Sequence, residues 1–173
     1  MKSLLEVMNE LSAPFLLSEG SLLQLYRSCS VGNSDIDIAL SHKWWKEHPE
    51  ELRIGLEKKG FTNTIVFGKM DSFGYEQAWT MDGIKVDIFS GVIEDNNQVI
   101  GLWINDNLYP CYLPVTAAGK FLWRDEVYVR VPIPIESALG AMYGRNFRYP
   151  IKDWSWGLYP FITGYCSYDK KSE

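Results

Sequence analysis

Cysteine and histidine are both scarce in this chain of 173 residues. The three cysteines, Cys29, Cys111 and Cys166, are odd in number and form no C-x-x-C pair. They therefore disfavour a disulfide framework and supply no zinc ligand set, although one bridge with a single free thiol stays open. The two histidines, His42 and His48, lie in a polar, helix-like stretch without other ligands nearby, so we expect both on the surface.

An excess of basic charge and a long apolar run are also missing. Lys and Arg number 17 against 22 Asp and Glu, a net charge of −5, which is unlike a protein that binds a long nucleic acid. No segment approaches the roughly 20 apolar residues that span a bilayer, and the first residues lack the apolar core of a signal peptide. We expect a soluble, cytoplasmic protein with no membrane span, provided that the chain is not part of a longer one.

What the chain does contain is typical of a globular protein. Hydrophobic residues make up 46% of it and aromatic residues 14%, enough for a core without disulfides. The sequence shows no repeats, low-complexity tracts or linkers, which predicts a single domain over residues 1–173. The aromatic tail with Trp154 and Trp156 has two readings: stacking on a sugar or base, or packing of a core or lid.

Hydrophobic periodicity predicts a mixture of helices and strands. Helical spacing covers residues 2–12, the stretch after Gly20, 43–59 with a break at Pro49, and 135–143. Strand patterns cover residues 15–17, 35–40, 61–70, 75–81, 84–89, 99–104, 121–123 and 127–131. Asp82-Gly83 is a strong signal for a two-residue hairpin turn before the strand at 84–89.

Three aspartates stand on two of these strands. Asp35 and Asp37 alternate with apolar residues, so their side chains point to one face with Cα atoms roughly 6 to 7 Å apart. Asp87 likewise alternates with its apolar neighbours, Val86 and Ile88. Carboxylates so placed can converge on Mg²⁺ or a similar hard cation, whereas a merely solvated strand face is the alternative.

A possible phosphate site precedes the acidic strand. Gly20 permits a close backbone approach, and Ser21 is a candidate N-cap that forms a capping box with Gln24. The exposed amides of such a helix N-terminus can hold a phosphate, and Arg27 within two turns could pair with the same anion. An ordinary capped turn and a solvated arginine are the structural alternatives.

Together these groups resemble a known family. The residues that carry the resemblance are Gly20-Ser21-Leu22-Leu23, Arg27, Ser34-Asp35-Ile36-Asp37-Ile38, Val86-Asp87-Ile88-Phe89 and Tyr143-Gly144. Their order and spacing over roughly residues 13 to 157 look like the nucleotidyltransferase superfamily, and within it the LicD and fukutin-type group. Many members have an extra aspartate and a tryptophan before the acidic pair, where this chain has the residues 31–34.

The resemblance implies an α+β nucleotidyltransferase fold, with a mixed β-sheet and flanking helices. It also implies transfer of a phospho-alcohol, such as phosphocholine or ribitol phosphate, from a CDP-alcohol to a glycan hydroxyl with release of CMP. Asp35, Asp37 and Asp87 would be the metal and catalytic carboxylates, using Mg²⁺ or Mn²⁺, while Gly20, Ser21 and Arg27 would bind the phosphate-bearing substrate.

Two alternatives to this hypothesis remain open. One is a small-molecule nucleotidyltransferase that moves a nucleotide onto a small hydroxyl acceptor and releases pyrophosphate. The other is a non-catalytic domain of the same fold that binds a nucleotide or a partner protein. The presence of all three aspartates disfavours this second alternative.

Overall fold

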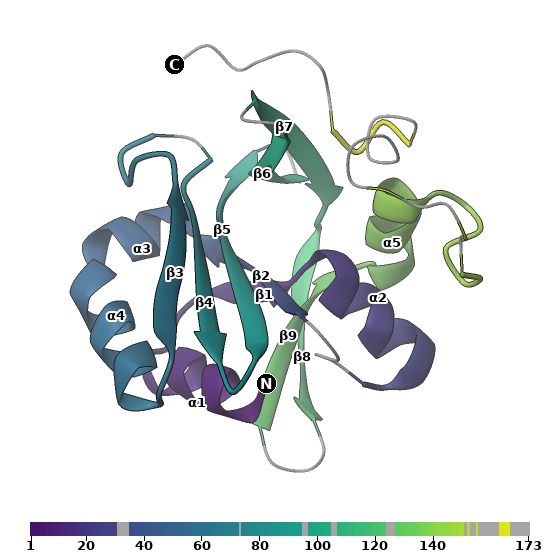
Figure 1. Cartoon of the computed structure of the whole chain (residues 1–173). Helices are drawn as coiled ribbons and strands as arrows, with labels where there is room; N and C mark the ends of the chain where they lie inside the picture. The colour runs from purple at the N-terminus through teal and green to yellow at the C-terminus, as the bar shows by residue number, and fades with distance from the viewer. Residues whose placement is uncertain are drawn as a thin grey trace.

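Figure 1 shows a computed structural model that describes residues 1–30, 35–72, 74–94, 97–104, 107–123, 127–150, 152, 155 and 163–166. Its helices are α1 (Lys2–Glu10), α2 (Glu19–Ser28), α3 (His42–Glu47), α4 (Pro49–Lys58) and α5 (Ile135–Tyr143). Its strands are β1 (Phe15–Leu17), β2 (Asp35–Ser41), β3 (Thr62–Phe67), β4 (Glu76–Met81), β5 (Ile84–Glu94), β6 (Asn97–Ile104), β7 (Asn107–Pro114), β8 (Ala117–Trp123) and β9 (Val127–Ile133).

The described strands form one large mixed sheet and one hairpin. Seven strands make the large sheet, in the order β1-β2-β5-β4-β3, with β6 attached to β5 and β7 attached to β6. The pairing of β2 with β5 is parallel, whereas the other pairings are antiparallel. Strands β8 and β9 pair separately. The expected α+β class, with a mixed sheet and flanking helices, is confirmed.

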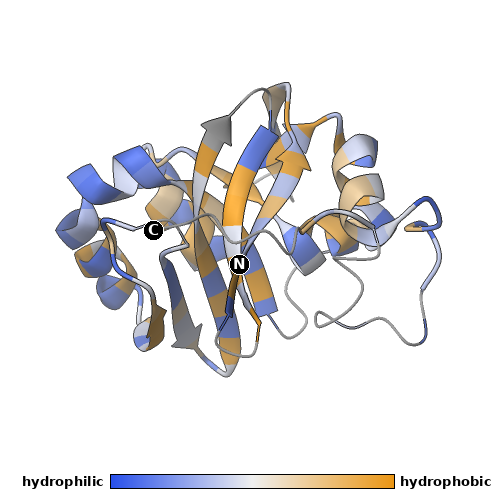
Figure 2. Ribbon diagram, turned by 90° about the horizontal axis from the view of Figure 1, so that it is seen from above, coloured by the Kyte–Doolittle hydropathy of each residue, from blue (hydrophilic) through white to orange (hydrophobic). Residues whose placement is uncertain are grey.

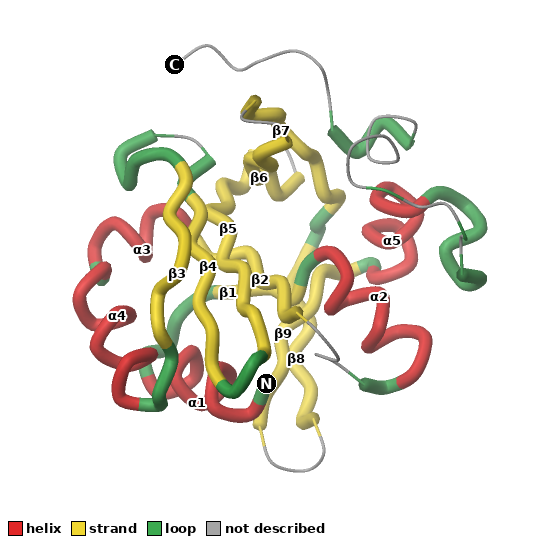
Figure 3. Tube along the Cα trace, in the orientation of Figure 1, coloured by secondary structure: helices red, strands yellow, loops and turns green. Residues whose placement is uncertain are grey.

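Helices cover the sheet on both sides (Figures 1 and 3). Helices α3 and α4 lie to one side, where α3 packs on β2 and β5 and α4 on α1. The fully buried Ile36, Ile38, Val86 and Ile88 of β2 and β5 belong to the core, as does Trp45 of α3. Figure 2 shows hydrophobic residues concentrated along the central strands. On the other side, α2 packs against β2 and α5, and α5 reaches β7 and β9.

In the described ranges, no helix has the length and apolar character needed to cross a membrane.

The structure departs from the sequence prediction after residue 104. No strand was expected between residues 105 and 120, but β7 pairs with β6 along its whole length. Pro110 and Pro114 obscured this strand in the sequence, because proline is tolerated in a sheet mainly at its edge. Among the described strands, β7 is such an edge strand, with β6 as its one strand partner. Trp154 and Trp156 lie outside the described residues. The break predicted at Pro49 is confirmed as the boundary between α3 and α4.

The open question about the cysteines has an answer. Cys111 of β7 and Cys166 form a disulfide across a sequence separation of 55, while Cys29 is free and exposed. The bridge fastens the short segment 163–166 to β7, where the Tyr112 amide also donates to the Tyr165 carbonyl at 2.8 Å.

Candidate active site

Parallel pairing of β2 with β5 brings the predicted aspartates together. In the register, Asp37 lies directly opposite Asp87 and Asp35 opposite Lys85. Since alternate residues of a strand share a face, all four of these side chains project from the same side of the sheet. Asp37 and Asp87 are each only 6% exposed. Two carboxylates that are far apart in the sequence are thus held side by side in a largely buried place.

The start of α2 lies against Asp37. The Ser21 amide donates to Asp37 Oδ2 at 3.2 Å, and the Asp37 amide donates to Ser21 Oγ at 2.8 Å. A Cβ at Gly20 would lie 3.2 Å from Asp37 Oδ2, so the glycine allows a close approach of helix and carboxylate. The Gly-Ser pair and the acidic strand therefore form one site. The binding of phosphate by this pair stays a prediction.

The predicted capping box is wrong. The helix begins at Glu19, and its N-cap is Ser18, which makes no side-chain capping bond. Ser21 lies inside the first turn, and its hydroxyl oxygen accepts from the Asp37 amide, a tertiary contact in place of a local cap. Ser21 thereby fixes the position of the Asp37 main chain and carboxylate together.

The Arg27 guanidinium is bonded to backbone carbonyls, in contrast to the predicted side chain available for a phosphate. Its Nε donates to the Phe147 carbonyl at 2.8 Å, and its Nη2 donates to the carbonyls of Phe147 and Tyr149, the latter at 2.7 Å. The side chain therefore ties α2 to the segment after α5. A role of Arg27 toward substrate phosphate stays a prediction, and the observed contacts assign it a structural role.

Charge repulsion is built into the aspartate cluster. Burial, followed by the charges of Asp35 and Asp87, raises the pKa of Asp37 to about 7, although the Ser21 amide opposes this shift. Burial also raises the pKa of Asp87, although the Lys85 ammonium lies 2.8 Å from Asp87 Oδ2 and works in the opposite direction. The other oxygen, Asp87 Oδ1, is buried and has no hydrogen-bond partner among the described residues. The cluster therefore carries more negative than positive charge, and one of its buried oxygens lacks a hydrogen-bond donor.

Sequence reasoning missed a fourth carboxylate. Glu76 lies opposite Phe89, two residues beyond Asp87 along β5, and so shares the face of the aspartates. Burial and then the charge of Asp87 raise the pKa of Glu76 to about 7. A signal was available, because the Asp82-Gly83 turn fixes the register of β4 on β5. Counting back from that turn places Glu76 beside Asp87.

A buried contact between Glu19 and Tyr165 supports the start of α2, and the sequence analysis did not predict it. Glu19 is fully buried, its φ is 44°, and the Tyr165 hydroxyl donates to its Oε1 at 2.5 Å. Burial raises the pKa of Glu19 to about 8, against the lowering effect of that hydrogen bond. Within the described part of the chain, its second oxygen, Oε2, has no hydrogen-bond partner. The residue next to Gly20 is therefore held in a left-handed conformation by a tyrosine from the disulfide-anchored segment.

The chemistry of the site suits a hard cation. Asp35, Asp37 and Asp87 supply oxygen ligands from one face, and the unpartnered Asp87 Oδ1 together with the raised pKa values fits a position that lacks a positive charge. However, across the described part of the chain, no three His, Cys, Asp or Glu side chains lie close enough together to form a metal-binding group. Metal binding is accordingly a proposal.

Comparisons with known proteins come from sequence and from structure. No protein-family model matches the chain. Among solved structures, the lincomycin-bound lincosamide antibiotic adenylyltransferase LnuA aligns with a TM-score of 0.47 and 14% identity, covering 74% of this chain and 75% of that one.

Among curated proteins, the chain is 24% identical over 159 residues to ribitol-5-phosphate transferase FKTN of Macaca fascicularis. It is 23% identical over 159 residues to FKTN of Homo sapiens and 24% identical over 169 residues to that of Mus musculus. Each match covers 90% of this chain but 34% of the relative, so the chain spans about a third of the length of these relatives. These similar proteins are transferases by name.

Proposed function

We propose that this chain carries a metal-dependent transferase site that moves a phospho-alcohol from a CDP-activated donor to a hydroxyl of a glycan or a smaller acceptor. The observation that carries the proposal is the parallel register of β2 and β5, which sets Asp37 beside Asp87 with Gly20 and Ser21 against Asp37. The arrangement of a helix N-terminus next to paired carboxylates suits a phosphate ester and its counter-ion.

The relatives found by sequence favour one of the two candidate transferred groups. Similarity to ribitol-5-phosphate transferases over 90% of this chain favours ribitol phosphate over phosphocholine as the transferred group. A CDP-alcohol as the donor, in place of a nucleoside triphosphate, is what the resemblance to the LicD and fukutin-type motifs implies. The metal, the donor and the acceptor are parts of the same proposal.

Each carboxylate has a role that follows from its place. Asp35, Asp37 and Asp87 would hold Mg²⁺ or Mn²⁺, which when bound would neutralise the charge of the transferring phosphoryl group. Asp87, whose Oδ1 has no hydrogen-bond partner among the described residues, would accept the proton of the acceptor hydroxyl. The hydroxyl oxygen then bonds to the phosphorus while the bond from phosphorus to the CMP oxygen breaks. Ser21 keeps Asp37 in place during this exchange.

A product assay tests the proposal. The chain is incubated with CDP-ribitol or CDP-choline, a polyol or glycan acceptor, and Mg²⁺ or Mn²⁺, and the released nucleotide is identified. We expect CMP that appears only with a divalent cation and is lost in Asp37→Asn. Asp71→Asn is the matched control, since Asp71 is 88% exposed and pairs only with the exposed Lys46 among the contacts described.

Other outcomes would redirect the proposal. Pyrophosphate released from a nucleoside triphosphate, with no CMP from a CDP-alcohol, would favour the small-molecule nucleotidyltransferase. Binding of a cytidine nucleotide with no turnover under any metal would favour a non-catalytic nucleotide-binding domain. CMP release that continues at the wild-type rate in Asp37→Asn would remove the acidic cluster from the reaction.

A further inference from the structure

A cavity of about 640 Å³ lies at the far end of the strands that carry the aspartates. Ser41, the last residue of β2, lines the cavity. Gly91 of β5, which lies opposite Ser41 in the register, lines it too. Both residues share the face of Asp37 and Asp87 by strand alternation, and four residues of strand separate each from its aspartate, about 13 Å. The cavity and the candidate active site thus lie at two ends of one face of the β2–β5 pair, with buried residues between them.

The walls of this cavity are mainly apolar. Pro14 and Leu16 from the β1 region, Val92 of β5 and Val115 before β8 contribute to them. Its volume falls in the range of small-molecule sites, which are typically apolar with a few placed polar groups. A glycan or polyol suits such walls less well than a flat aromatic group, because most of the wall offers no hydrogen-bond partner for its hydroxyl groups.

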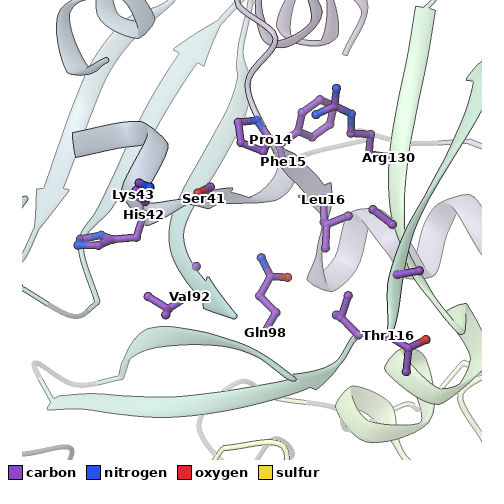
Figure 4. Close-up of a pocket in the computed structure, with 14 residues that line it drawn as sticks. Pro14, Phe15, Leu16, Ser41, His42, Lys43, Val92, Gln98, Thr116 and Arg130 are labelled. Atoms are coloured by element: carbon purple, nitrogen blue, oxygen red, sulfur yellow. The ribbon is translucent and has the colours of Figure 1, made fainter. Parts of the chain in front are cut away.

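Gln98 lines this space together with other polar residues, namely Ser41, His42, Lys43, Thr116 and Arg130. Figure 4 shows its side chain reaching from β6 into the space between Ser41 and Leu16. Gln98 is 4% exposed, and no residue that the structure describes forms a hydrogen bond with its amide oxygen Oε1. A buried amide oxygen without a donor is costly unless a ligand supplies one.

Glycine at position 91 makes room for this amide. A Cβ on Gly91 would lie 2.6 Å from Gln98 Nε2, closer than any side chain tolerates. The small residue therefore lets the Gln98 amide pack closely against β5 at the wall of the cavity.

A nucleobase satisfies all of these requirements. Its faces are apolar enough to pack between the aliphatic walls, and its edge carries N–H donors for the Gln98 amide oxygen. The separation of about 13 Å between the Ser41–Gly91 pair and the aspartates is of the order of an extended nucleotide from base to outer phosphate.

We propose that this cavity receives the base of the nucleotide donor and that the Gln98 amide binds the N–H edge of that base. The inference rests on the proposed function for the identity of the donor as a nucleotide. It assigns the base to the cavity end of this face and the phosphates to the aspartate end. Gln98 becomes a binding residue remote from the reacting atoms.

Calorimetric titration in the presence of Mg²⁺ tests the assignment. CMP is titrated into the wild type, Gln98→Met and Gly91→Ala, and ribose 5-phosphate, which lacks a base, serves as the second probe. We expect CMP affinity to fall about tenfold in Gln98→Met, the ratio that one buried hydrogen bond is worth. Gly91→Ala, which displaces the amide without changing its chemistry, should weaken CMP in the same direction.

The control replaces a glutamine on the opposite face of the sheet. Gln77 pairs with Ile88 in the register, and its amide is already bonded to Tyr75 and Trp79. Gln77→Met should leave CMP affinity unchanged, and ribose 5-phosphate should bind every variant that retains a wild-type melting temperature as it binds the wild type.

The outcomes separate this inference from the proposed function. If CMP binds Gln98→Met and Gly91→Ala as tightly as it binds the wild type, the base assignment is overturned. The proposed transferase function would still stand if CMP is released in the product assay. An equal loss for ribose 5-phosphate in Gln98→Met would place a sugar, not a base, in the cavity and also overturn it. A wild type that binds no CMP overturns both proposals.

Discussion

Replacement of Asp37 by asparagine separates the stability of the fold from the function of the site. The native pKa of Asp37 is raised from 3.8 to about 7 by burial and then by Asp35 and Asp87. An acid whose pKa is higher in the folded state binds its proton more tightly there, so its contribution to stability is present below pH 4 and is lost as the pH rises through about 7. Asparagine does not ionise and keeps an oxygen for the Ser21 amide.

The size of the effect follows from the same linkage. One pKa unit corresponds to about 1.4 kcal/mol, so between about pH 5 and about pH 8 the ionisation of Asp37 lowers the free energy of unfolding by about 2 to 3 kcal/mol. In the absence of divalent cations, Asp37→Asn should gain that amount relative to the wild type over the same interval. It should also lose turnover, because a neutral amide is a poor ligand for Mg²⁺.

Urea denaturation at the two pH values, with a chelator present, measures this double difference. Asp71→Asn should show none of it, since exposed surface substitutions usually change stability by less than about 0.5 kcal/mol. A wild type and an Asp37→Asn variant whose stabilities run parallel from about pH 5 to about pH 8 would show that Asp37 is not held in a repulsive, buried cluster. Full activity of the variant would refute its catalytic role.

Three further outcomes are expected from the surroundings of the site. Replacing both Cys111 and Cys166 by serine should lower the free energy of unfolding by about 4 kcal/mol, as expected for a bridge across a sequence separation of 55, and Cys29→Ser should leave urea denaturation unchanged. Gly20→Ala places a methyl 3.2 Å from Asp37 Oδ2 and should lower kcat about tenfold with a small change in unfolding free energy, which steady-state kinetics and urea denaturation check together. Tyr165→Phe removes the hydroxyl that holds Glu19 and should shift the pKa of Glu19 upward, visible as a change in the pH dependence of stability; an unchanged dependence would disconnect this tyrosine from the α2 terminus.

Local pattern was sufficient for several parts of the site. The alternation of Asp35 and Asp37 with isoleucines predicted a half-polar strand, and β2 has its isoleucines fully buried. The Asp82-Gly83 turn predicted the hairpin of β4 and β5, which the structure confirms. Both results depend on the two-residue period of a strand and on turn geometry, which neighbouring residues determine among themselves.

Local pattern was misleading where a tertiary contact outweighed a local one. Ser21 followed by Gln24 has the sequence of a capping box, but the Ser21 hydroxyl bonds to the amide of Asp37 on a different element. Arg27 looked available for an anion, and its guanidinium instead bonds to carbonyls of the segment after α5. In each case the polar group is satisfied by a partner distant in sequence, which no short pattern encodes.

The sequence by itself determined which residues are chemically able to act: three aspartates on two strands and a glycine-serine pair before them. Only the tertiary structure decided that β2 pairs with β5 in parallel, so that Asp37 meets Asp87, and that Tyr165 reaches Glu19 across 146 residues. The physical reason is that side-chain direction is a property of the local backbone. Pairing between distant segments depends instead on the burial and hydrogen bonding of the whole chain, set against the entropy of closing long loops.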